Sequence, residues 1–231
     1  MSKIMPKNVR YDSIAILLAN RKYLYHLLQK IFGDEPTLET LNSLNSDFTQ
    51  TSLALLSMED KLSGIKSFLS KLEQDREKEL DKLCSEYTRL FLGPAKLPAP
   101  PWESVYVNKE RLIFQESTLK VREWYLKYDF VPTNYRTEAD DHIALELDFM
   151  ANLADFAENS LENNQIDSLI KILNDQKSFL EKHMLNWVPQ YVADLQASTT
   201  HPFYFEAAGI LNLFLKVDHA VVTEIIRELN I

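Results

Sequence analysis

The sequence is poor in glycine and cysteine, and each shortage excludes a class of protein. Only four of the 231 residues are glycine, far below the usual share of about 7%. This disfavours turn-rich β architecture, and neither of the glycine-rich phosphate-binding patterns, G-x-G-x-x-G or G-x-x-x-x-G-K-[ST], occurs. The single cysteine, Cys84, cannot form an intrachain disulfide, and its helical context predicts a small buried apolar side chain.

Long apolar runs and a surplus of positive charge are also missing. No stretch approaches the roughly 18 apolar residues of a membrane-spanning helix, and the apolar run at residues 14–19 is too short for the core of a secretory signal. We therefore expect a cytoplasmic protein. The 34 acidic and 25 basic side chains give a formal charge of −9, which disfavours DNA and RNA as partners and favours a cationic one.

Apolar residues recur every three or four positions along most of the chain, which predicts helices. The best strand candidate, residues 111–114, is too short to build a sheet. We predict an all-α fold, a bundle of roughly ten helices. The expected helices begin near residues 12, 37, 57, 76, 117, 137, 166, 188, 202 and 218, with a Ser57–Asp60 capping box at the third, a Thr137–Asp140 capping box at the sixth and Asp218 as the cap of the last.

One segment divides the helices into two groups. Residues 129–136 contain Pro132 and Asn134 and have the composition of a linker. We predict a single domain over residues 1–231, with helical halves at about 1–128 and 137–231.

The helix expected from residue 137 is apolar on two sides, which predicts a buried position in the centre of the bundle. Ile143, Leu147 and Met150 belong to one apolar face, and Leu145 and Leu153 belong to the other. Charged side chains gather at the N-terminal end of this helix. They are Glu138, Asp141 and His142, with Glu146 one turn later.

A proline-rich loop precedes this helix in the chain. Four of the nine prolines fall within residues 94–101, directly before Trp102. Because proline fixes φ and favours extended backbone, the loop predicts a stiff arm that presents Trp102 to a partner. A rigid connector whose indole fills the protein's own core is the alternative.

Catalytic patterns are weak. His142 and Glu146 are four residues apart and could share a helix face, which leaves a metal-dependent hydrolase as an alternative function, but H-E-x-x-H and G-x-S-x-G are absent. We expect neither a metal site nor an enzyme. The aromatic residues near Trp187, Tyr191 and Tyr204 are expected to be core.

Three blocks together resemble the TorD/DmsD family, whose members are cytoplasmic chaperones that mature molybdenum-containing redox enzymes. The resemblance is to the DmsD-like branch of this family. The blocks are the loop at residues 93–106, the sequence EADDH at residues 138–142, and the pair HMLNW at residues 183–187 with HPFY at residues 201–204. They follow the family's order and cover residues 84–215.

The resemblance implies a chaperone that binds the twin-arginine leader of an apo molybdoenzyme subunit and assists cofactor insertion and export control. Carboxylates would contact guanidinium groups, and aromatics would cover the apolar part of the leader. The candidate leader-binding residues are Pro100, Pro101, Trp102, Ser104, Tyr106, Glu138, Asp141, His142 and Glu146. The chain departs from the family at Glu103 and Ala139, where glycine and proline are usual, and at Ala95 and Lys96, where some DmsD-like members have an aromatic.

Two further family traits are implied by the resemblance alone, namely weak guanine-nucleotide binding and dimers that exchange helical halves. No cofactor is otherwise expected, and the working form is either a monomer or such a dimer. A structural subunit of a redox complex is a further alternative function.

Overall fold

The structure is a computed structural model that describes residues 7–56, 62–93, 96–108, 110–132 and 138–230. This part of the chain is helical and has no strand, which confirms the all-α prediction. Two helices continue into π-helical turns, η2 (Thr88–Leu92) and η3 (Leu180–Met184). The α-helices are α1 (Lys7–Gly33), α2 (Leu38–Leu44), α3 (Asp47–Leu55), α4 (Ser63–Gln74), α5 (Arg76–Tyr87), α6 (Glu103–Val107), α7 (Glu116–Lys127), α8 (Ile143–Glu162), α9 (Ile166–Phe179), α10 (Leu185–Ser198) and α11 (Pro202–Leu229).

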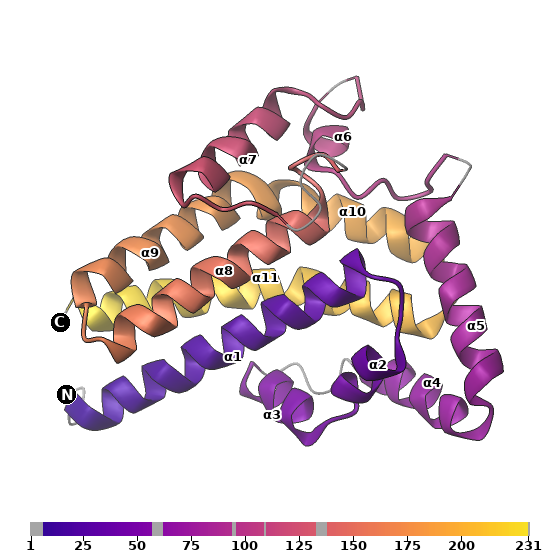
Figure 1. The fold of residues 1–231 in the computed structure, drawn as a ribbon, viewed down its shortest axis with the longest axis horizontal. Coiled ribbons are helices and arrows are strands. Elements are labelled where there is room, and N and C mark those ends of the chain that lie inside the picture. Colours follow the sequence, from indigo (N-terminus) through magenta and orange to yellow (C-terminus); the bar gives the residue numbers. More distant parts are fainter. Residues whose placement is uncertain (1–6, 57–61, 94–95, 109, 133–137, 231) are drawn as a thin grey trace.

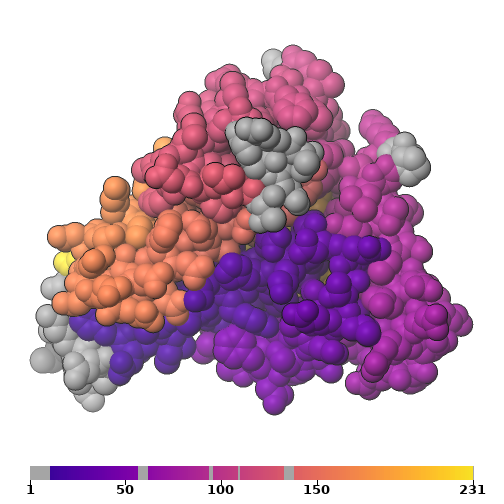
Figure 2. All heavy atoms as spheres, viewed as in Figure 1, coloured from indigo at the N-terminus to yellow at the C-terminus, as the bar shows by residue number. Residues whose placement is uncertain are grey.

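The long helices form the body of the molecule. Helix α8 packs against α1 on one side and α9 on the other, and α11 packs against α10, α9, α4 and α1 (Figure 1). The face shown in Figure 2 hides most of α11 behind these neighbours. Since α1 comes from the first predicted half and packs chiefly against α8 from the second, both halves build one core.

Helix α8 is the central helix that its two apolar faces predicted. Leu147 and Met150 on one face and Leu145 and Leu153 on the other are all buried. Its N-terminus differs from the prediction, because the helix begins at Ile143 and not near residue 137. Glu138 and Asp141 therefore precede the helix and do not belong to its first turn.

The last two predicted helices are one continuous helix, α11. Asp218 is not a cap. Its carboxylate is buried inside the helix bundle, 2.5 Å from Nε of Arg21 in α1, and it also accepts a hydrogen bond of 2.6 Å from the Tyr25 hydroxyl. An aspartate in a helical pattern resembles a cap in sequence, and only the tertiary partner shows its role.

Smaller predictions have mixed outcomes. Thr37 caps α2 as expected, with its hydroxyl accepting from the Thr40 N–H at 3.2 Å. Cys84 is half-buried, not fully buried, and its thiol donates to the Pro36 carbonyl at 3.6 Å. The capping box at Ser57, the cap at Thr137 and residues 133–136 of the predicted linker lie outside the described residues.

Candidate functional site

The proline loop is attached to the N-terminus of α8 by backbone hydrogen bonds. Trp102 and His142 form an isolated antiparallel bridge. The Glu103 N–H donates to the Asp141 carbonyl at 3.0 Å, and a second backbone bond of 2.9 Å lies on the other side of the bridge. The loop and the acidic segment, about 40 positions apart in sequence, are therefore side by side, as a single site that includes candidate residues from both would require.

Trp102 is neither a free arm nor a core residue. Its side chain is half-buried, and its indole Nε1–H donates to Oε1 of Glu138 at 2.8 Å. The indole also meets the His142 ring edge-on, with ring centroids 5.6 Å apart. Trp102 and Glu138 thus form a fixed, partly accessible pair of an aromatic and a carboxylate.

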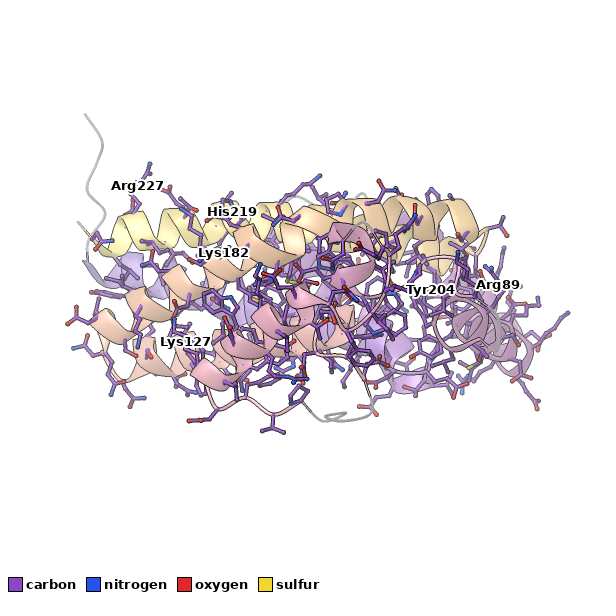
Figure 3. The ribbon with its side chains drawn as sticks, turned by 90° about the horizontal axis from the view of Figure 1, so that it is seen from above. Arg89, Lys127, Lys182, Tyr204, His219 and Arg227 are labelled. Atoms are coloured by element: carbon purple, nitrogen blue, oxygen red, sulfur yellow. The ribbon has the colours of Figure 1, made fainter. Side chains whose placement is uncertain are left out.

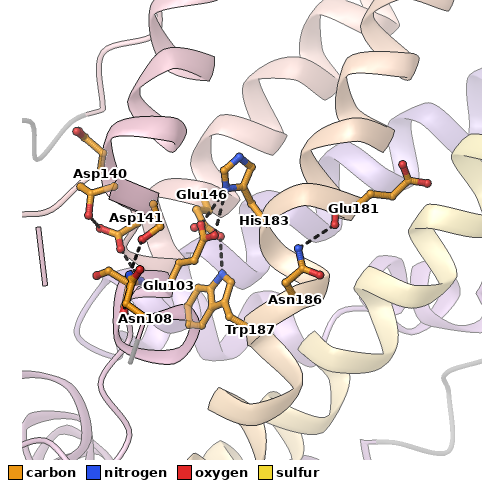
Figure 4. Close-up of polar contacts among 12 residues, drawn as sticks. Glu103, Asn108, Asp140, Asp141, Glu146, Glu181, His183, Asn186 and Trp187 are labelled. Atoms are coloured by element: carbon orange, nitrogen blue, oxygen red, sulfur yellow. Dashed lines mark hydrogen bonds and ion pairs between the residues drawn. The ribbon is translucent and has the colours of Figure 1, made fainter. Parts of the chain in front are cut away.

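Asp141 has a structural position. Its side chain is fully buried, with Oδ2 accepting from the Ser104 N–H at 2.7 Å and Oδ1 accepting from the Thr118 hydroxyl at 2.9 Å (Figure 4). It therefore satisfies a backbone donor in the first turn of α6 and joins that helix to α7. Both oxygens are bonded inside the protein in this conformation, so contact between Asp141 and a guanidinium group stays a prediction and would require the side chain to become exposed.

Glu146 is also beneath the surface. Its Oε2 accepts from Nε1 of Trp187 at 3.1 Å, and its Oε1 is buried with no hydrogen-bond partner among the described residues. Burial raises the pKa of Glu146 well above its usual range, and the nearby charges of Glu103 and Asp141 raise it further. Nearby, Glu103 lies 2.9 Å from Nδ1 of His183 (Figure 4).

His142 is the N-cap of α8. Its Nδ1 accepts from the Ala144 N–H at 3.1 Å, so the ring is neutral at this nitrogen, and burial lowers the pKa of His142 to about 4. His142 has an internal hydrogen-bond partner at Nδ1, and Glu146 has one at Oε2. Among the residues that the structure describes, no three His, Cys, Asp or Glu side chains are grouped to hold a metal ion.

The remaining candidates divide by exposure. Pro101 and Ser104 are buried, whereas Pro100 and Tyr106 are half-buried. The Tyr106 ring stacks on Trp187, with centroids 5.6 Å apart. The candidate residues that keep some exposure are Pro100, Trp102, Tyr106, Glu138 and His142.

Beside Trp102 lies a groove that the sequence analysis did not predict. The proline loop, the residues that follow α6 and the last turns of α10 line it, with Pro100, Arg111, Ile113 and Asp194 among them. Part of its lining did stand out in the sequence, because residues 111–114 were the best strand candidate. They form an irregular loop, with Arg111 and Phe114 at φ of 50° and 59°. Asp194 gave no signal, because it is far from the loop in sequence.

The described helices include none with the length and hydropathy of a membrane span.

Comparisons with known proteins identify similar chains. The family model described as nitrate reductase delta subunit matches residues 55–193. The chain is 29% identical over 201 residues to the chaperone protein TorD of Aliivibrio fischeri, covering 86% of this chain and 92% of that one. It is 30% identical to TorD of Vibrio atlanticus over the same shares of the two chains. It is 28% identical over 220 residues to TorD of Vibrio cholerae, covering 94% and 98%. These relatives are chaperones and not enzymes.

Among solved structures, the chain is similar to a proposed redox enzyme maturation protein from Archaeoglobus fulgidus. The TM-score is 0.49 at 21% sequence identity, and the match covers 85% of this chain and 93% of that one.

Proposed function

The chain belongs to the nitrate reductase delta subunit family, which includes the TorD chaperones, and we propose that it binds the twin-arginine leader of a molybdenum-containing oxidoreductase. It holds the apo catalytic subunit in the cytoplasm during cofactor insertion and controls its export. The family model matches more than half of the chain, and the TorD relatives match nearly its whole length, so the likeness is not confined to one motif.

The observation that carries the proposal is the pairing of Glu138 with Trp102, whose indole lines a groove of mixed apolar and charged residues. A leader with two arginines and an apolar stretch needs an accessible carboxylate and apolar surface close together. The half-buried indole and the half-buried carboxylate supply both, and the hydrogen bond between them fixes their orientation before the peptide arrives. A charge-assisted hydrogen bond from an arginine to such a carboxylate contributes about 1.5–3 kcal/mol.

In this proposal the candidate residues have two kinds of role, which differ with their burial. Glu138 and Trp102, with Pro100 and Tyr106, are accessible and contact the peptide in this proposal. The buried residues hold the loop in place, because Asp141 bonds the start of α6, and Glu146 bonds Trp187 beneath Tyr106.

The test is a peptide titration by fluorescence anisotropy. The labelled probe has two adjacent arginines followed by leucine and alanine residues, and a matched peptide carries glutamine at both arginine positions. We expect the arginine peptide to bind and the glutamine peptide to bind at least tenfold more weakly. Trp102→Ala is expected to weaken binding of the arginine peptide at least fivefold, about 1 kcal/mol.

Trp124→Ala is the matched control, because Trp124 is also half-buried but packs on Phe179 in a different part of the bundle. It is expected to bind within twofold of the unmodified protein. Equal affinity of Trp102→Ala and the unmodified protein would remove the loop from the site. Equal affinity for the two peptides would remove the leader as the ligand.

A further inference from the structure

In the groove beside Trp102, the guanidinium group of Arg111 lies between the ring of Tyr106 and the carboxylate of Asp194. Its guanidinium carbon lies 5.8 Å from the centroid of the Tyr106 ring, and its Nη2 lies 3.6 Å from Oδ2 of Asp194. The other oxygen of Asp194 accepts from Nε2 of Gln190 at 2.9 Å. A ring face and an oriented carboxylate together form a place that suits a planar guanidinium group.

The segment that follows Arg111 has the chemistry of the ligand proposed above. Leu112, Ile113 and Phe114 come directly after it, and their exposed fractions are 58%, 40% and 66%. An arginine followed by exposed apolar side chains is what a twin-arginine leader would also present. Arg111 and Phe114 adopt the left-handed backbone region that disfavours residues other than glycine, so the loop holds this arrangement against its local preference.

Asp194 is accessible, as Glu138 is, whereas two of the other predicted carboxylates are not. Asp141 and Glu146 are fully buried, whereas the Asp194 side chain is 29% exposed in the groove that also includes Trp102. The ion pair with Arg111 is itself partly solvated, since the Arg111 side chain is 61% exposed. Such pairs are weak, so a competing arginine can displace Arg111.

We propose that Asp194 and the face of Tyr106 bind one arginine of the leader, and that Arg111 occupies this place in the free protein as an intramolecular competitor. The inference rests on the proposed function and names the residue that selects for arginine on the α10 side of the groove. Leader binding exchanges one guanidinium for another, and Arg111 with its apolar neighbours moves away from Asp194.

The experiment measures the affinity of the same twin-arginine peptide for charge variants. Arg111→Gln removes the competitor and is expected to bind the peptide at least threefold more tightly. Asp194→Asn removes the acceptor charge and is expected to bind at least fivefold more weakly, whereas Asp194→Glu keeps the charge and retains most of the affinity. In the Asp194→Asn background, adding Arg111→Gln is expected to have no further effect, because the competitor has lost its site.

Matched controls change the net charge equally away from the groove. Ser198 at the end of α10 lines the groove, and its carbonyl accepts a hydrogen bond of 2.8 Å from Arg89. Figure 3 shows Arg89 at one end of the molecule and Arg227 at the other, so Arg227 is far from the groove. Arg227→Gln and Asp167→Asn, on exposed turns of α11 and α9, are expected to change the affinity less than twofold.

Two results overturn the inference. If the unmodified protein binds the peptide and Arg111→Gln binds it no more tightly than Arg227→Gln does, Arg111 is no competitor, and the proposed function stands without it. If neither the unmodified protein nor any variant binds the peptide, both the inference and the proposed function fail. Circular dichroism of each variant verifies that the helices are intact, and the Asp194→Glu protein supplies the comparison if Asp194→Asn does not fold.

Discussion

Glu103 and His183 form a buried pair in which a carboxylate oxygen lies 2.9 Å from Nδ1 of the imidazole. They are 80 positions apart and connect the proline loop to η3. Glu103 stands where the TorD/DmsD family usually has glycine, and His183 opens the third block of the resemblance. The departure therefore adds a contact between two of the three blocks that carry the resemblance, and it ties the first turn of α6 to η3.

Glu103→Ala is expected to destabilise the protein by about 3 kcal/mol, because removal of one partner leaves the other polar group buried without it. Urea denaturation at pH 7 measures the change, and Glu110→Ala, at an exposed position of the next loop, is the control. A double-mutant cycle with His183→Ala should give a coupling energy above about 1 kcal/mol. Additive single effects would show that the two side chains do not interact.

Glu146→Gln is expected to stabilise the protein at high pH. Burial and the charges of Glu103 and Asp141 raise the pKa of Glu146 above 4.5 in the folded state. Between pH 4.5 and that higher value the folded protein binds a proton that the unfolded chain has released, so this group makes stability fall as pH rises. The glutamine variant lacks this penalty, so its advantage should be smallest near pH 4.5 and should grow as the pH rises toward 8.

Denaturation curves of both proteins from pH 4.5 to pH 8 measure this difference. Glu162→Gln, at an exposed position at the end of α8, serves as the control and should show no pH-dependent difference. A constant difference between Glu146→Gln and the unmodified protein at all pH values would contradict the prediction.

His142→Asn is expected to remove a sensitivity to acid. Burial lowers the pKa of His142 to about 4, and its neutral Nδ1 accepts the Ala144 N–H at the N-terminus of α8. Between pH 6.5 and about pH 4 the unfolded chain binds a proton that the folded protein excludes, so stability falls by up to about 1.4 kcal/mol per pH unit as the solution becomes more acid. Asparagine caps the helix without titrating, so thermal unfolding of the variant should change less over this range. An identical acid loss in both proteins would contradict this role.

Asp218→Ala is expected to destabilise the protein by about 3–5 kcal/mol, because it leaves the guanidinium of Arg21 buried without its partner. If Asp218 only capped a helix, the loss would be about 0.5–2 kcal/mol. Urea denaturation therefore distinguishes the buried pair from a cap. The combined variant Arg21→Met with Asp218→Leu should recover part of the loss, because it buries no charge.

Most helices could be predicted from the sequence, because apolar spacing and end signals are local. Gly93 ends the helical run of α5 and η2, and Pro202 begins α11 close to the predicted positions. The meeting of the loop with the start of α8 was inferred from the resemblance and from the charge cluster. It could not be located to individual atoms, because the Trp102–His142 bridge is a long-range backbone contact.

The burial of the site carboxylates could not be predicted in the same way. An acidic residue near a helix start has the same sequence pattern whether it faces solvent or bonds a neighbouring helix. Asp141 faces inward because α6 and α7 supply two donors, Ser104 and Thr118, that lie 37 and 23 positions before it. Asp194 was missed because an aspartate on a helix surface is common in sequence. Its place in the groove is defined by its contact with Arg111, which is distant in the chain.

Glu138→Gln and Asp141→Ala are expected to separate peptide contact from loop positioning. Glutamine at position 138 can still accept the hydrogen bond from Trp102 Nε1 but carries no charge. Its affinity for the twin-arginine peptide should fall about fivefold to tenfold, or roughly 1–1.4 kcal/mol, with no change in the unfolding midpoint. Asp141→Ala removes the acceptors of Ser104 N–H and the Thr118 hydroxyl, so it should lose about 2 kcal/mol or more of stability as well as affinity.

Thermal unfolding and peptide titration of the same samples measure both quantities. Thr118→Val is the control for Asp141, because it removes one of the two hydrogen bonds and keeps the carboxylate bonded to Ser104. It should show about half of the stability loss and bind the peptide nearly as well as the unmodified protein. If Asp141→Ala lost affinity at unchanged stability, its carboxylate would reach the peptide directly. The conformation that binds the leader would then have to expose a side chain that is buried in the free protein.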